Sequence, residues 1–67
     1  MQTYTVLYKT PDILPFDPPL GFICQADDTE HAEEQCLDAE PDADILWVVI
    51  TDNVEVALRD YWGIEMN

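Results

Sequence analysis

The octapeptide "DILWVVIT", Asp44–Thr51, decides the fold, because no other segment of the chain has so strong a strand pattern. Its apolar run is rich in β-branched and aromatic side chains. Both faces of the strand are apolar. In strict alternation one face carries Ile45, Trp47 and Val49, and the other carries Leu46, Val48 and Ile50. Such a strand is expected to be central in its sheet or covered on both sides.

Two more strands and a helix precede this segment. Gln2–Lys9 alternates in the manner of a strand, and "FICQA", Phe22–Ala26, predicts a shorter one. Asp27 or Asp28 is expected to cap the helix that follows, and Asp27-x-x-Glu30 has the spacing of a capping box. This helix should run to about residue 39, because residue 41 is a proline.

A second helix is predicted after the apolar strand. Asp52-x-x-Glu55 is again a capping-box spacing, and Gly63 is expected to end the helix. One helical stripe carries its apolar residues, which are Val54, Ala57, Leu58, Tyr61 and Trp62.

The resulting order is β-β-α-β-α, which predicts a single α+β domain over residues 1–67. We expect a three-stranded, mainly antiparallel sheet with the first strand in the middle and two helices packed on one face. On that arrangement the second face of the 44–51 strand needs another cover. Either the proline-rich loop or a second copy of the chain would supply it, so monomer and homodimer both stay open.

The loop "TPDILPFDPPLG", residues 10–21, contains four prolines and cannot form regular structure. It nevertheless carries Ile13, Leu14 and Phe16. These three side chains predict either a lid that folds back over the sheet or a surface that contacts a partner.

The charge of the chain is unusual: fifteen acids face only Lys9 and Arg59, which gives a net charge of −13. Such a protein repels nucleic acids and anionic membranes and attracts basic partners. No apolar run reaches the ~20 residues of a membrane span, and no secretory signal opens the chain, so we expect a cytoplasmic protein. Cys24 and Cys36 should then be reduced thiols, with a disulfide between them as the alternative.

Nine of the acids lie between residues 26 and 44, where there is no Lys or Arg. They are Asp27, Asp28, Glu30, Glu33, Glu34, Asp38, Glu40, Asp42 and Asp44. On a helical wheel Ala32, Cys36 and Ala39 form a narrow inward stripe, while Leu37 falls among the acids. The opposite side carries a longitudinal carboxylate row made of Asp27, Glu30, Glu34 and Asp38.

Catalytic and metal chemistry are not expected. The chain has no Ser and a single His, and His31 stands at no zinc-binding spacing from either cysteine. With only Gly21 and Gly63, a glycine-rich phosphate loop is excluded. We therefore predict a protein that is not an enzyme and holds no cofactor and no metal.

Two interpretations of the acidic stretch remain. A solvated helix face that serves solubility is the simpler one, although soluble surfaces usually mix charges of both signs. The other is that the nine acids form a partner-binding surface that imitates a nucleic-acid backbone. They would then occupy the Lys/Arg groove of a nucleic-acid-binding protein.

In size, charge and compact α/β organisation the chain resembles the small acidic inhibitors made by bacteriophages, among them anti-CRISPR proteins and other DNA mimics. The residues that carry the resemblance are the nine acids, with Asp12, Asp17, Asp52, Glu55 and Asp60 as lesser contributors. The resemblance implies a protein of the bacterial host cytoplasm that binds a CRISPR effector, with type I Cascade favoured. It would block binding of the target DNA or of its protospacer-adjacent motif.

Two alternatives stand beside this expectation. A small adaptor would dock through Ile13–Phe16 and the apolar strand surface, with its acids serving solubility alone. A DNA mimic could also inhibit a restriction or repair nuclease instead of a CRISPR effector.

Overall fold

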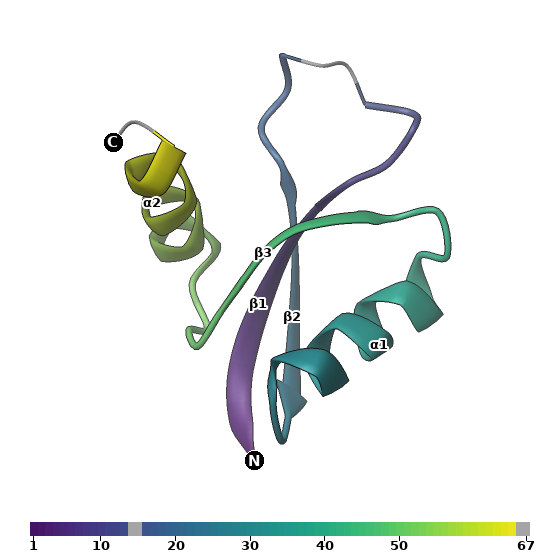
Figure 1. Ribbon diagram of the computed structural model, residues 1–67, viewed down its shortest axis with the longest axis vertical. Coiled ribbons are helices and arrows are strands. Elements are labelled where there is room, and N and C mark those ends of the chain that lie inside the picture. Colours follow the sequence, from purple (N-terminus) through teal and green to yellow (C-terminus); the bar gives the residue numbers. More distant parts are fainter. Residues whose placement is uncertain (14–15, 66–67) are drawn as a thin grey trace.

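The computed structural model of the protein describes residues 1–13 and 16–65, with side chains as far as residue 63. Its elements follow the predicted order β-β-α-β-α (Figure 1). They are β1 (Gln2–Lys9), β2 (Leu20–Ala26), α1 (Thr29–Ala39), β3 (Asp44–Val49) and α2 (Val54–Glu65). The predicted α+β class is therefore confirmed.

The three strands form one antiparallel sheet in the order β2-β1-β3. Val6 on β1 pairs with Phe22 on β2 and with Val48 on β3, which confirms the first strand as the middle one. The strong 44–51 segment thus lies at an edge, so of the two alternatives predicted for it, a central position and cover on both sides, the first does not hold. Both helices nevertheless pack against β3, so its other predicted property, cover on both sides, is confirmed.

The two helices lie on opposite faces of the sheet, not on one face as expected (Figure 1). On one face Tyr4 and Val6 pack in a core cluster with Ala32 and Cys36 of α1. The next residue along β1, Leu7, points to the other face and is also fully buried. Because successive side chains of a strand point in opposite directions, a second layer must cover Leu7, and α2 provides it.

The α2 face is closed by small residues and one buried polar contact. Ala57 is fully buried, and Gly21 on β2 lies directly beneath the side chain of Val54. The Thr5 hydroxyl, also fully buried, donates a hydrogen bond of 2.8 Å to the Thr51 carbonyl oxygen. Helix α2 thus covers the second face of β3, which the sequence predicted to be covered by the proline-rich loop or by a second copy of the chain.

A β-bulge shifts the faces of β3. Leu7 pairs with Trp47 but Tyr8 pairs with Ile45, so Leu46 has no opposite residue on β1. Ile45 and Val48 consequently both pack against the α1 core cluster. The simple alternation that placed Ile45 on the same face as Trp47 is therefore wrong, because the extra residue reverses it.

The start of α1 differs by one residue from the predicted capping box. Asp28 is the N-cap, and its Oδ1 accepts a hydrogen bond of 2.8 Å from the His31 N–H. Residue Asp27 precedes the cap, so the Asp27–Glu30 spacing does not form the predicted capping box. At its other end the helix stops at Ala39, as predicted.

The capping residue of α2 is one position later than predicted, and the helix extends beyond its predicted end. The side chain of Asn53, not that of Asp52, accepts from the Glu55 N–H at 2.9 Å. Gly63 lies inside the helix, which continues to residue 65. The apolar stripe is largely as expected, with Val54, Leu58 and Tyr61 partly buried, whereas Trp62 at its end is 43% exposed.

The proline-rich loop does not place Phe16 over the sheet, because that side chain is 96% exposed. Ile13 is partly buried and Pro19 is buried. Leu14, the third apolar side chain of the predicted lid or contact surface, is outside the described residues. The contact interpretation is thus the one that fits Phe16.

Gly21 and Gly63 give a matched test of this packing. A Cβ at Gly21 would lie 2.7 and 2.8 Å from the two Cγ atoms of Val54, whereas a Cβ at Gly63 meets nothing within 4 Å. We expect Gly21→Ala to lower the free energy of unfolding by about 1–3 kcal/mol, since α2 must move away. Gly63→Ala should raise it by about 0.5–1 kcal/mol, because the residue is interior to a helix. Urea unfolding of both variants checks this, and a neutral Gly21→Ala would contradict the packing of α2 on β2.

Candidate functional site

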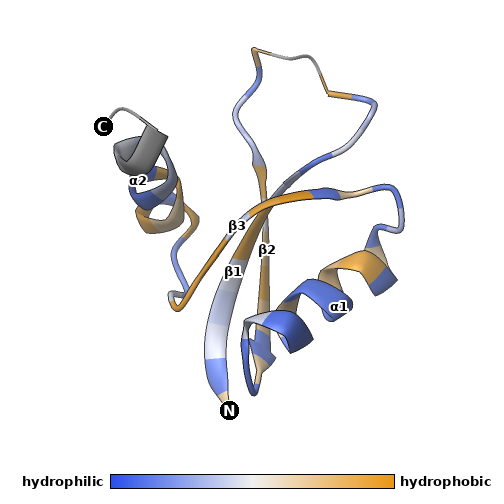
Figure 2. Ribbon diagram, viewed as in Figure 1, coloured by the Kyte–Doolittle hydropathy of each residue, from blue (hydrophilic) through white to orange (hydrophobic). Residues whose placement is uncertain are grey.

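The nine predicted partner-binding acids lie on α1, on its flanking turns and at the first residue of β3. All are exposed except Glu33, which is partly buried. Helix α1 is hydrophilic along most of its length, whereas much of β3 is hydrophobic (Figure 2). Of the nine, Glu30, Glu33, Glu34 and Asp38 lie within α1 itself, and the other five lie before or after it.

The carboxylate row of Asp27, Glu30, Glu34 and Asp38 follows the outer side of α1. Asp27 lies before the N-cap, and the three members within α1 extend from Glu30 to Asp38, about 12 Å of helix at 1.5 Å per residue. Three of the row's four members, together with Asp28 and His31, line a shallow hollow of about 280 Å³. Each like-charge neighbour in the row costs a few tenths of a kcal/mol, and α1 contains no Lys or Arg to offset it.

The inward side of α1 is narrower than predicted. Ala32 and Cys36 are fully buried, but Ala39 is exposed because α1 ends there. Leu37 is 39% exposed, in agreement with its predicted place among the acids. Only two small buried residues therefore hold the acidic helix against the sheet, with help from Gln35, whose Nε2 donates to the Gln25 carbonyl at 2.8 Å.

At the start of α1 two of the acids have structural contacts. Asp28 caps the helix, and Asp27 lies beside His31. Nδ1 of His31 accepts a hydrogen bond of 3.3 Å from the Asp27 N–H. The same nitrogen lies 4.0 Å from Asp27 Oδ2.

At the other end of the stretch the fold brings a base to the acids. Lys9 pairs in register with Asp44 across β1 and β3, and it lines a hollow of about 260 Å³ with Asp42 and Asp44. The sequence analysis missed this neighbour. The signal was available, because Lys9 ends the first strand and Asp44 begins the strand that runs antiparallel to it.

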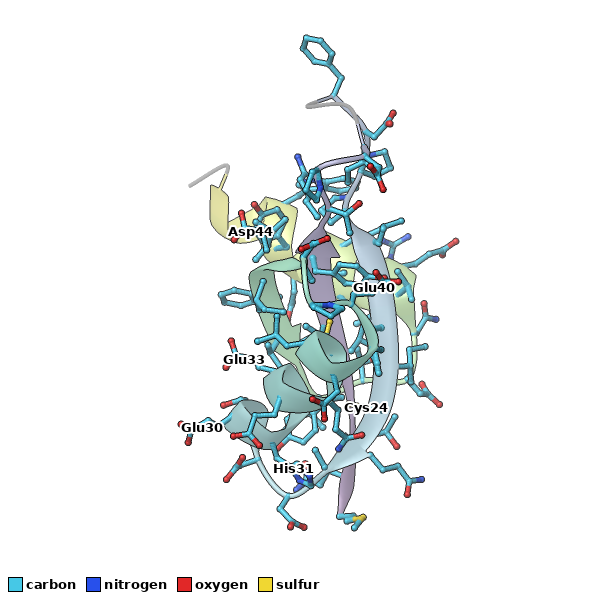
Figure 3. All side chains as sticks on the ribbon, turned by 90° about the vertical axis from the view of Figure 1, so that its right-hand side faces the viewer. Cys24, Glu30, His31, Glu33, Glu40 and Asp44 are labelled. Atoms are coloured by element: carbon cyan, nitrogen blue, oxygen red, sulfur yellow. The ribbon has the colours of Figure 1, made fainter. Side chains whose placement is uncertain are left out.

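Four of the nine acids separate onto two sides of α1. Glu30, Glu33 and Asp44 lie on the side of β3, whereas Glu40 lies on the side of β2 (Figure 3). Glu40 is the C-cap, and its N–H donates to the Cys36 carbonyl at 2.8 Å. Burial raises the pKa of Tyr8, and the negative charge of Glu40 raises it further. The nine acids therefore do not form a single uniform surface.

Both cysteines are free thiols, and they lie between α1 and the sheet. Cys24 Sγ donates to the Ala32 carbonyl at 4.0 Å. Burial raises the pKa of Cys36 to about 11, with further contributions from Cys24 and Glu40, and burial also raises the pKa of Cys24. A protonated, buried thiol is a poor nucleophile.

Two further properties follow from the described part of the chain. No group of three His, Cys, Asp or Glu side chains gathers there in a way that could hold a metal ion. None of the helices in that part has the length and apolar character needed to cross a membrane.

Comparison of the chain with models of known protein families, with curated proteins and with solved structures found no match. The function of the acidic surface must therefore be argued from its own geometry and charge.

The Cys36 thiol predicts how stability changes at alkaline pH. Its pKa rises from 9.0 to about 11 on folding, so the unfolded chain loses this proton at lower pH than the folded one. The stabilising contribution is complete below pH 9 and is lost as the pH rises toward 11. We expect the free energy of unfolding to fall by on the order of 1–2 kcal/mol over this range.

Urea unfolding across this pH range measures the effect, and Cys36→Ala is the informative variant. It should be less stable at every pH because it leaves a small cavity, but its loss of stability above pH 9 should be smaller than in the wild type. An unchanged pH dependence would contradict the assignment to Cys36.

Proposed function

We propose that this protein binds the nucleic-acid groove of a basic protein through α1 and competes there with nucleic acid. The observation that carries the proposal is the carboxylate row, whose members Glu30, Glu34 and Asp38 lie on the outer side of a helix that contains no Lys or Arg, with Asp27 just before its cap. Lys9 lies beside Asp42 and Asp44, at the C-terminal end of the acidic stretch. We therefore assign the partner contact to α1 and not to that end.

The physical basis is the one that drives DNA binding. A Lys/Arg groove binds DNA largely because neutralised phosphates release condensed counterions. A rigid row of carboxylates at intervals of one helical turn offers the same groove a comparable set of anions. Because α1 is already folded and capped, no ordering of the row has to accompany binding.

Within this class, we propose a CRISPR effector as the target, with type I Cascade first, because the chain resembles phage-encoded inhibitors of the anti-CRISPR type. Occupation of the DNA-binding channel or of the site that reads the protospacer-adjacent motif would block target binding. A restriction or repair nuclease is the alternative target of the same surface. On this proposal the protein acts stoichiometrically and not as an enzyme, in the cytoplasm of the bacterial host.

A triple charge neutralisation tests the proposal. Glu30→Gln, Glu34→Gln and Asp38→Asn, combined, remove three charges from the row. We expect the affinity for purified Cascade to fall, and the slope of log K against log salt to decrease by about 3, one for each lost contact. Titration in a DNA-displacement assay at several salt concentrations measures both quantities.

The matched control is Asp52→Asn, Glu55→Gln and Asp60→Asn, which removes the same charge from exposed positions outside α1. This control should keep nearly all of the affinity. If both triple variants lose affinity equally, net charge alone is responsible and the α1 surface is not the contact. Unchanged binding by the α1 variant would refute the proposal.

A second candidate function, a small adaptor, is favoured by Phe16. This aromatic side chain is 96% exposed and borders a hollow of about 430 Å³, together with Pro18, Pro19 and Trp62. An aromatic side chain so exposed is typical of a contact residue. Phe16→Ala would abolish partner binding by an adaptor, whereas the α1 triple variant would leave it intact. The nucleic-acid mimic should show the reverse.

A further inference from the structure

The outer edge of β3 is an open strand edge. In the order β2-β1-β3, β3 pairs with β1 alone, so within residues 1–13 and 16–65 the backbone groups on its other side have no sheet partner. Figure 1 looks onto this edge, with α1 on one side of it and α2 on the other. The segment from Ile45 to Val49 contains no charge and no proline, which are the usual means of protecting an edge.

A groove runs beside this edge toward α1. It has a volume of about 300 Å³ and is lined by Thr29, Glu33, Ile45, Leu46, Trp47 and Val48. Four of these six residues belong to β3 and are apolar, and of these Ile45 and Val48 lie on the α1 face of the strand. Glu33, the one partly buried acid of the nine, forms its opposite wall, and Glu30 lies on the same side of α1 (Figure 3). The groove therefore combines free backbone groups, an apolar floor and a carboxylate rim.

We propose that the β3 edge binds an extended, basic segment of the partner protein as a fourth strand of the sheet. Backbone hydrogen bonds to β3 would supply affinity, apolar side chains of the segment would fill the groove, and its Lys or Arg side chains would meet Glu30 and Glu33. This inference rests on the proposed function, because the extended segment belongs to the same basic protein that α1 binds.

Charge complementarity selects this occupant over a second copy. In an antiparallel β3–β3 dimer the two α1 helices would lie side by side on the same face. The carboxylate rim of Glu30 and Glu33 would then meet its own copy, in a pair of chains that each carry −13. A basic segment meets the same rim with the opposite charge.

The other edge of the sheet is less available. On β2 the Gln25 carbonyl already accepts the hydrogen bond from Gln35 of α1. No acid of the rim stands beside it, because Glu30 and Glu33 lie on the β3 side (Figure 3). The inference is therefore specific to β3, and the two edges can serve as test and control.

The first experiment uses two synthetic octapeptides of equal composition as probes. One alternates Lys and Val, so that its valines share one face as in a strand; the other has a Lys block followed by a Val block. We expect the alternating peptide to shift the backbone amide resonances of residues 45–49 and to slow their hydrogen exchange. It should bind about tenfold more tightly than the block peptide, which can contact the carboxylates alone.

Variants then locate the site. Leu46→Lys places a positive charge in the groove at a residue with no partner on β1, and it should weaken the alternating peptide about tenfold or more. Ile23→Lys, at a 47% exposed position on β2, is the matched control and should bind as the wild type does. Circular dichroism verifies that both variants are folded. If Leu46→Lys does not fold, Glu33→Gln against Glu34→Gln gives the same comparison without a new charge.

Three outcomes would overturn the inference. They are amide shifts confined to α1, equal binding of the two peptides, and a concentration-dependent dimer through β3 in sedimentation. Its failure is distinguishable from failure of the proposed function. If Leu46→Lys still displaces DNA from Cascade while the α1 triple variant does not, the mimic stands and only the strand addition is wrong.

Discussion

Burial of β1 on both of its faces is the constraint on which the rest of the structure depends. Val6 and Leu7 are adjacent in sequence, point in opposite directions and are both fully inaccessible to solvent. A sheet whose central strand is apolar on both sides needs two covering layers, and this chain has one helix for each. The helices therefore separate to opposite faces, and β2 and β3 are left as edges.

The same constraint explains how the chain tolerates its acidic helix. One side of α1 contributes Ala32 and Cys36 to the core around Tyr4 and Val6, and this contact is lost if the helix leaves the sheet. The Asp28 cap adds a charged acceptor at the helix N-terminus, where negative charge is favourable. Repulsion among the carboxylates costs only tenths of a kcal/mol per pair in water, so a small buried stripe and one cap can offset it.

Most of the candidate site could be predicted, since it depends on local periodicity. The 3.6-residue repeat of α1 places the acids outward and Ala32 and Cys36 inward, whatever the helix packs against. Ala39 departs from that pattern only because the helix ends there. The neighbours of the acids could not be predicted in the same way. The approach of Lys9 to Asp44 and the groove between Glu33 and β3 depend on strand pairing, which joins residues far apart in the chain.

By itself the sequence determined the order of the elements, their lengths to within about two residues, the middle position of the first strand and the outward acidic face of α1. These follow from hydrophobic period, proline positions and capping side chains, all of which act within a few residues. Only the tertiary structure decided which face each helix covers, where the bulge at Leu46 reverses the alternation of β3, and which edge remains open beside Glu33. Each of these depends on which surface is left uncovered after the strands have paired, and no local pattern contains that information.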